Sequence, residues 1–268
     1  FNIPTPKEDT IELLKNYFFN RDDIASYDKY WKSIFETDEE TKAYWDTEII
    51  TGRLRRTFID LFFYSYLQII IQNGELNVST NDKDEFSKVE ELFESYKKFI
   101  KDYKNDNKQI LLEDIKEYAV IFRNNFRYDT IDNELTDKAG VERINAIIFG
   151  LETTTLISYV LYVLKNAANE VSRNDLFEYL ESYIMRRMVV HANTKNYNQL
   201  FTDRLISNQV ISKDQFKDLI EKSADKVNYF PSDPELLNGF HNEILINKQS
   251  AGILYFIESK IRNKSYHS

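Results

Sequence analysis

Apolar side chains recur at the 3.6-residue spacing of an α-helix along nearly the whole chain, and this periodicity limits the fold more than any other feature. Residues 82–103 have an apolar face and a charged face, which predicts an outer amphipathic helix. Residues 58–71 and 139–164 are apolar on most sides, which predicts two central helices. Period-two alternation is weak and confined to residues 75–78, and only 6 Gly and 4 Pro among 268 residues disfavour the many tight turns of an all-β fold. The sequence therefore predicts an all-α protein, a large multi-helix bundle.

Helix-start signals and one aperiodic segment organise the chain. Capping boxes, in which a Ser or Thr is followed three residues later by Glu or Gln, occur at residues 5–8, 37–40, 212–215 and 232–235, and residues 172–175 form a variant. Residues 127–137 lack periodicity and are a candidate hinge. We expect one helical domain over residues 1–268, with candidate sub-bundles 1–127 and 138–268. Because residue 1 is Phe, the chain is expected to be a fragment of a longer protein.

Composition and charge narrow the function. The net charge of −9 argues against a protein that coats nucleic acid through its phosphates. The absence of Cys rules out disulfides and thiolate chemistry and suits a reducing interior, so we expect a cytoplasmic location. No apolar run reaches membrane length, and no membrane partner is expected. The three histidines are isolated and lack metal-ligand spacing. We therefore expect no catalytic residue, no metal site and no cofactor in this chain.

A basic cluster, Arg53-Leu-Arg-Arg56, precedes the apolar segment 58–71, and we expect one long helix from about Gly52 to Asn73. On such a helix Arg53 and Arg56 share a face and are the candidate nucleic-acid contacts. The alternative is an exposed or carboxylate-paired helix start, which the acidic balance of the chain favours.

A second basic pair, Arg186-Arg187, lies in a segment with an apolar helical stripe. At about 100° per residue, Leu180, Ile184 and Arg187 fall on one stripe, whereas Arg186 lies off it. A buried guanidinium needs a partner, because an unpaired buried charge is costly. Arg187 is therefore expected to form a buried structural ion pair, and its own helix offers no suitable carboxylate. Glu152, which interrupts an apolar helix, is the first candidate partner; Glu258 and Asp203 are the alternatives.

Seven blocks together resemble one known family. In order along the chain they are Glu12-Leu-Leu-Lys-Asn-Tyr-Phe-Phe19, Tyr27-Asp-Lys-Tyr-Trp31, Leu54-Arg-Arg-Thr-Phe-Ile-Asp-Leu-Phe62, Glu181-Ser-Tyr-Ile-Met-Arg-Arg187, Asn196-Tyr-Asn-Gln-Leu-Phe201, Phe230-Pro-Ser-Asp233 and Ile253-Leu-Tyr-Phe-Ile-Glu258. The set resembles the GmrSD-type restriction endonucleases and covers nearly the whole chain.

That resemblance implies a function. Such proteins couple an N-terminal ParB/sulfiredoxin-like nucleotide-hydrolysing domain, with an Asp-Gly-Gln-Gln-Arg motif, to a C-terminal His-Asn-His nuclease, and they restrict foreign, often modified, DNA. Neither motif occurs in this sequence. The chain would then be the helical middle of a phage-defence nuclease, a non-catalytic linker or scaffold. Nucleotide and divalent metal are expected only in the flanking domains.

The same resemblance makes those flanking domains the expected partners, with DNA contacted weakly or indirectly. Formation of a homo-oligomer is left as an open alternative. The competing hypothesis is a stand-alone intracellular helical protein-interaction module, unrelated to nucleases. An enzyme complete within this chain is a third hypothesis, which no motif supports.

Overall fold

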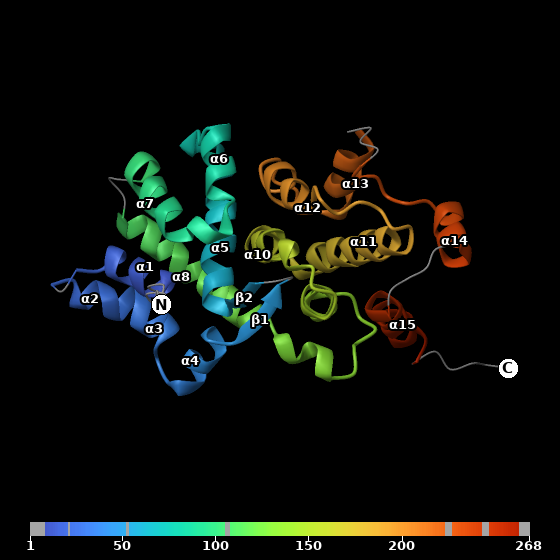
Figure 1. The fold of residues 1–268 in the computed structure, drawn as a ribbon, viewed down its shortest axis with the longest axis horizontal. Coiled ribbons are helices and arrows are strands. Elements are labelled where there is room, and N and C mark those ends of the chain that lie inside the picture. The colour runs from blue at the N-terminus through green and yellow to red at the C-terminus, as the bar shows by residue number, and fades with distance from the viewer. Residues whose placement is uncertain are drawn as a thin grey trace, which may run out of the picture. The chain divides into compact units, whose positions relative to one another are not determined.

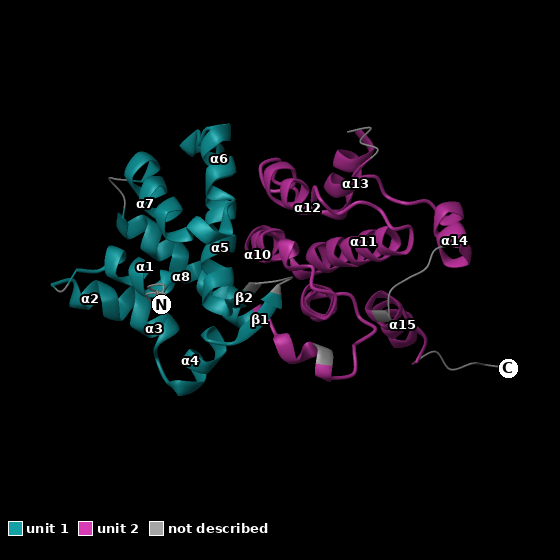
Figure 2. Ribbon diagram, in the orientation of Figure 1, with its two compact units in different colours: residues 1–124 teal, residues 125–268 magenta. Residues whose placement is uncertain are grey.

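The structure, a computed structural model, describes residues 9–20, 22–51, 54–104, 108–222, 227–242 and 247–262. The chain divides into two compact units, residues 1–124 and 125–268 (Figure 2). The division falls just before the aperiodic segment 127–137, in which Tyr128–Asp132 forms a short 3-10 helix, η4.

In its described residues, the first unit contains helices and one pair of short strands (Figure 1). Its elements are α1 (Thr10–Phe18), α2 (Ile24–Tyr27), the π-helix η1 (Asp28–Lys32), α3 (Ser33–Phe35), α4 (Glu39–Trp45), β1 (Glu48–Thr51), β2 (Leu54–Thr57), α5 (Phe58–Ile70), the 3-10 helices η2 (Gly74–Leu76) and η3 (Val89–Glu91), α6 (Thr80–Phe86), α7 (Leu92–Tyr103) and α8 (Lys108–Asn125). Because almost all the regular structure of the described residues is helical, the all-α prediction is confirmed.

The hairpin replaces the first turn of the helix expected from Gly52. Strands β1 and β2 pair antiparallel, with Ile49 opposite Arg56. Helix α5 begins at Phe58, where Thr57 Oγ1 accepts a hydrogen bond from the Asp60 backbone N–H at 3.3 Å. The expectation of a helix over residues 54–57 was wrong. The adjacent Ile-Ile-Thr run favours a strand, and the apolar helical pattern starts only at Phe58.

Helix α5 lies at the centre of the first unit, as its apolar composition predicts, and nearly all its side chains are buried. The core around it is aromatic. Phe63 stacks on Trp31 with ring centroids 5.6 Å apart and on Phe18 at 6.4 Å, and Phe62 contacts Phe35. Offset and edge-to-face ring pairs of this kind contribute beyond the apolar area that they bury.

The second unit is built around α11 (Glu170–Val189), the long central helix of this unit in Figure 1. Helix α11 packs against α9, α13 and α14. The remaining elements are α9 (Val141–Asn145), the π-helices η5 (Ala146–Gly150) and η7 (Leu200–Arg204), the 3-10 helix η6 (Thr154–Leu156), α10 (Ile157–Asn166), α12 (Tyr197–Gln199), α13 (Lys213–Lys222), α14 (Asp233–Asn242) and α15 (Asn247–Ile261).

The helix expected over residues 139–164 is interrupted. After η5 the backbone of Glu152 turns left-handed, with φ 55°, and the Thr153 N–H donates to the Ile148 carbonyl at 2.9 Å. Gly150 and the β-branched run at 153–155 have low helix propensity, which favours a break here. The expectation of one helix over residues 82–103 was wrong in the same way, because η3 separates α6 from α7.

The capping boxes were predicted with mixed success. Those at residues 212–215 and 232–235 are confirmed by reciprocal hydrogen bonds between the Ser and the Gln or Glu. Asp38, one residue after the predicted Thr, caps α4, and Asn169 rather than Ser172 caps α11. The box at residues 5–8 lies outside the described residues. No described helix is both long enough and apolar enough to cross a membrane.

Candidate functional site

Helix α11 places two arginines and a glutamate at the centre of the second unit. It starts at an Asn169 side chain that accepts from the Ser172 N–H at 2.9 Å, and it runs for twenty residues. Its apolar stripe, which includes Leu180 and Ile184, is buried. Arg187 lies on that stripe and is only 1% exposed, so its predicted burial is confirmed.

Neutral groups surround the Arg187 guanidinium. Nε donates to the Tyr197 hydroxyl at 3.1 Å, Nη1 to the Tyr229 carbonyl at 3.0 Å and Nη2 to the Asn193 carbonyl at 2.6 Å. The cation also lies over the rings of Tyr183 and Tyr197, 5.2 and 5.4 Å from their centroids. Ring faces and carbonyl oxygens attract a cation, but they leave its net charge in place.

The predicted ion pair of Arg187 with Glu152 was wrong. Glu152 lies at the break after η5, where its half-exposed side chain pairs with Lys248 at 2.5 Å. The alternative Glu258 pairs with Arg262, the residue after the end of α15, and Asp203 accepts from the Thr202 hydroxyl at 3.4 Å. Within the part of the chain that the structure describes, no carboxylate forms an ion pair with Arg187.

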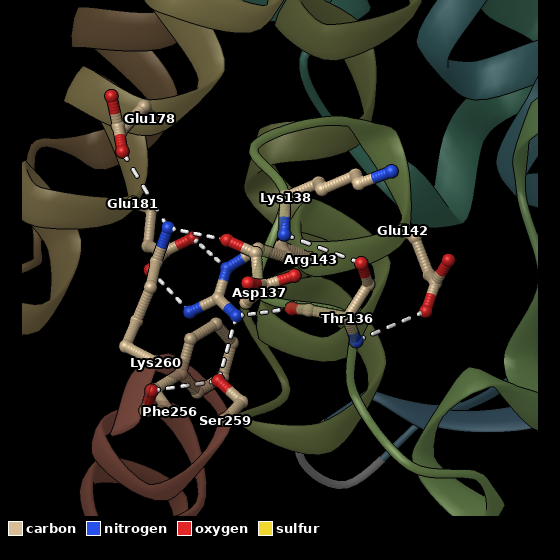
Figure 3. A network of polar contacts seen from close by, with 10 residues as sticks. All are labelled: Thr136, Asp137, Lys138, Glu142, Arg143, Glu178, Glu181, Phe256, Ser259 and Lys260. Atoms are coloured by element: carbon tan, nitrogen blue, oxygen red, sulfur yellow. Dashed lines mark hydrogen bonds and ion pairs between the residues drawn. The ribbon is translucent and has the colours of Figure 1, made fainter. Parts of the chain in front are cut away.

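Among the described residues of this unit, Arg143 instead forms a buried ion pair (Figure 3). Its guanidinium meets Glu181 of α11 in a bidentate fork, with Nε to Oε2 and Nη2 to Oε1 both at 2.7 Å. Arg143 is fully buried and Glu181 is nearly so. Sequence reasoning missed Arg143, although it interrupts the apolar segment 139–164 and so carries the same signal that singled out Arg187.

The Arg143 network joins three segments of the second unit. Nη1 donates to the Thr136 carbonyl at 2.5 Å and to the Ser259 hydroxyl of α15 at 2.7 Å. The guanidinium carbon lies 4.9 Å from the centroid of the Phe256 ring. Figure 3 shows groups from α11, α15 and the segment before α9 converging on the Arg143 cation of α9. Charge-assisted, bidentate contacts of this kind fix geometry strongly.

Arg186, the neighbour of Arg187, points to a more open environment. Its Nη2 pairs with Asp233 at 2.6 Å, Nη1 donates to the Pro231 carbonyl at 3.1 Å, and the cation lies 5.3 Å from the Phe230 ring centroid. Asp233 is 80% exposed, so this pair is in contact with solvent. The two arginines differ as the periodicity predicts.

Tyr197 and Tyr229, beside Arg187, both have a raised pKa and are neutral at physiological pH. Burial raises the pKa of Tyr197 above its ordinary value, and the adjacent Arg187 cation opposes that rise. Burial also raises the pKa of Tyr229; Glu235 adds to the effect and Arg187 opposes it. The pKa of Glu235 itself is lowered, chiefly by hydrogen bonds from Ser232. Neither phenol therefore supplies a negative charge to Arg187.

A pocket of about 450 Å³ lies beside Arg187. It is bounded by the segment after η5, the C-terminal end of α11, the turn before α12 and the first turn of α15. The lining residues are Leu151, Glu152, Thr153, Thr155, Ile184, Arg187, Met188, His191, Ala192, Thr194, Tyr197 and Gln249. All of them belong to the second unit.

Helix α11 ends at this pocket with a left-handed residue. His191 has φ 51°, its N–H donates to the Met188 carbonyl at 3.2 Å, and the Ala192 N–H donates to the Arg187 carbonyl at 2.9 Å. This is a Schellman ending, in which Gly is the preferred residue at the left-handed position. A non-Gly residue there costs about 1–2 kcal/mol. Glu152 and Gln209 are also non-Gly residues in the left-handed conformation, with φ 55° and 52°. Glu152 lines the same pocket as His191.

The structure describes one of the two predicted nucleic-acid contacts, Arg56. Arg56 is 8% exposed: its Nε pairs with Asp60 at 2.8 Å, Nη2 donates to the Asp60 carbonyl at 3.2 Å, and the cation lies over the Tyr64 ring. This environment favours the carboxylate-paired alternative for Arg56, because β2 turns its side chain onto α5. Arg53 lies outside the described residues. Arg55, which no prediction singled out, is exposed and 3.6 Å from Glu48.

Comparisons of the chain with models of known protein families, with curated proteins and with solved structures found no match. Among the described residues, no group of three or more His, Asp or Glu side chains is placed to hold a metal ion.

Proposed function

We propose that this chain is the helical linker or scaffold region of a cytoplasmic, phage-defence DNA restriction endonuclease that resembles the GmrSD type. It would join a nucleotide-hydrolysing sensor domain to a His-Asn-His nuclease domain and contribute no catalytic residue. One observation carries the proposal: sequence blocks that resemble this family, although separated along the chain, lie together in each unit, either in contact or joined through one shared side chain.

In the second unit, four of these blocks meet around three arginines, Arg186 and Arg187 of α11 and Arg143 of α9. Tyr197, from the fifth block, accepts a hydrogen bond from Arg187. In the sixth block, the Phe230 ring lies against the Arg186 cation and Asp233 forms an ion pair with it. The seventh supplies Phe256, whose ring lies against the Arg143 cation that pairs with Glu181. The blocks are therefore parts of one packed unit, as expected if the resemblance reflects a shared fold.

The three blocks of the first unit meet in its aromatic core. Phe19 of the first block contacts Trp31 of the second at a centroid distance of 6.1 Å. Phe35, just after the second block, links Trp31 to Phe62 of the third at 4.9 and 6.0 Å. Side chains packed this densely resist deformation, which suits a spacer that must hold two other domains at a set separation.

The alternative, a stand-alone protein-interaction module, is favoured by one surface feature. Helices α11, α14 and α15 line an apolar groove of about 560 Å³ that includes Phe240, Ile257 and Ile261, each 43–48% exposed. Exposed apolar patches commonly mark protein contacts. A flanking domain of the same protein would use such a groove as readily as a separate partner.

The first prediction concerns activity. The purified chain should neither hydrolyse ATP or GTP nor cut DNA when Mg²⁺ is supplied, since the motifs for both reactions are absent from its sequence. Phosphate release and plasmid nicking measure the two reactions. Turnover that persists at constant specific activity through a second, unrelated purification would contradict the proposal.

The second prediction concerns DNA. Duplex binding should be weak, with a Kd of about 10⁻⁴ M at physiological salt, and should weaken steeply as salt is added. Arg56→Ala should leave the affinity within about twofold, because the Arg56 cation is already paired with Asp60. Fluorescence anisotropy with a labelled duplex measures both effects, and Arg53→Ala tests the other predicted contact. A large loss of affinity in Arg56→Ala, at unchanged helical content, would be the opposite of the expected result.

A further inference from the structure

We propose that the pocket beside Arg187 binds a small molecule carrying an oxyanion, either a phosphate or a carboxylate. The site is formed by the segment after η5, the end of α11, the turn before α12 and the start of α15. The proposal goes beyond the scaffold function and does not depend on it.

The charge of Arg187 is the first reason. The side chain is 1% exposed, and the three hydrogen bonds from its guanidinium go to a phenol and two backbone carbonyls. A buried cation is normally paired, because its loss of hydration is otherwise uncompensated. Arg143, also buried in this unit, is paired with the carboxylate of Glu181. An anionic ligand in the pocket would give Arg187 the counter-charge that the described residues do not supply.

The donor inventory is the second reason. A guanidinium has five N–H donors. Three of them make the bonds to Tyr197, Tyr229 and Asn193, so two have no partner among the residues that the structure describes. Free N–H groups on one guanidinium can donate to two oxygens of the same ligand, the pairing that makes Arg a preferred residue for carboxylates and phosphates.

The rest of the pocket favours a negative ligand. Glu152 is the one carboxylate among the described lining residues, and Lys248 neutralises it at 2.5 Å. Thr155, Thr194 and His191 add polar side chains. Gln249 lies in the first turn of α15, where backbone N–H groups lack partners within the helix and the helix dipole is positive.

The size and apolar lining define the ligand further. About 450 Å³ exceeds the volume of a bare anion and falls in the range of small-molecule sites. Leu151, Ile184 and Met188 provide an apolar surface beside the cation. We therefore assign the ligand class as a compact metabolite with one oxyanion and a small apolar body.

Calorimetric titration of the whole chain at fixed ionic strength tests the assignment with three probes that share a phenyl ring. Phenyl phosphate and benzoate carry the two candidate oxyanions, and benzyl alcohol is the neutral control. At least one oxyanion should bind about tenfold more tightly than benzyl alcohol, the effect expected of charge-assisted hydrogen bonds. The stronger of the two identifies the group that the site prefers.

Three variants locate the site. Arg187→Gln should weaken binding of the preferred oxyanion about tenfold, whereas Arg186→Gln should stay within about twofold, because Arg186 pairs with Asp233 and does not line this pocket. His191→Gly places Gly, the preferred residue, at a left-handed position, so the variant should fold normally. Because it removes one polar side chain from the pocket lining, it should bind the preferred oxyanion about threefold more weakly.

The proposal is overturned if neither oxyanion binds the wild-type chain better than benzyl alcohol, or if the Arg187 and Arg186 variants bind alike. Should Arg187→Gln fail to fold, equal binding by His191→Gly and the wild-type chain would overturn it as well.

Discussion

Glu181→Gln should lower the free energy of unfolding by about 3–5 kcal/mol, because it removes the charge that compensates a buried cation. Arg143 is fully buried, and Glu181 supplies both oxygens of its bidentate fork. The amide keeps the shape of the side chain but presents an N–H₂ group to a guanidinium. Urea denaturation followed by circular dichroism measures the change.

A matched control lies one turn earlier on the same helix. Glu178 is half exposed and sits 3.5 Å from Lys260, so Glu178→Gln should cost no more than about 1 kcal/mol. Both variants remove one negative charge from α11, and they differ only in burial and pairing. Equal costs for the two would mean that the Arg143 network does not hold the second unit together.

Arg187→Ala should destabilise the chain by about 3–5 kcal/mol, far more than its neighbour Arg186→Ala at about 1 kcal/mol. The Arg187 change empties a buried space and leaves the Tyr197 hydroxyl and two carbonyls, of Tyr229 and Asn193, without their donor. The Arg186 change breaks a solvent-exposed contact with Asp233.

Arg187→Lys should rescue little of that loss, because a single ammonium cannot reach three acceptors that diverge from a planar fork. Thermal and urea unfolding of the three variants give the ranking. If Arg187→Ala costs no more stability than Arg186→Ala, the hydrogen bonds and rings around Arg187 contribute no more to stability than a surface contact does.

The burial of Arg187 could be read from periodicity, whereas its partners could not. Helical spacing reports which face of a helix is apolar, so it correctly separated Arg187 from Arg186. It does not report which distant segment covers that face. The carboxylate expected at Arg187 is found at Arg143, and backbone carbonyls take its place around Arg187.

Local breaks set the second limit on prediction from sequence. The apolar pattern of residues 139–164 is continuous, yet the backbone turns left-handed at Glu152, and this directs its side chain to Lys248. The β1–β2 hairpin likewise removes Arg56 from the helix on which a phosphate contact was expected. At the first place Gly150 and three threonines have low helix propensity, and at the second the Ile-Ile-Thr run of β1 favours a strand that pairs with residues 54–57.

The reading frame that encodes this chain gives the most direct test of the proposed function. Sequencing the gene on both sides should show an Asp-Gly-Gln-Gln-Arg motif upstream, in a domain with ParB/sulfiredoxin-like patterning, and a His-Asn-His motif downstream in the same frame. A frame that carries neither motif would contradict the assignment to a restriction endonuclease and would favour the stand-alone interaction module.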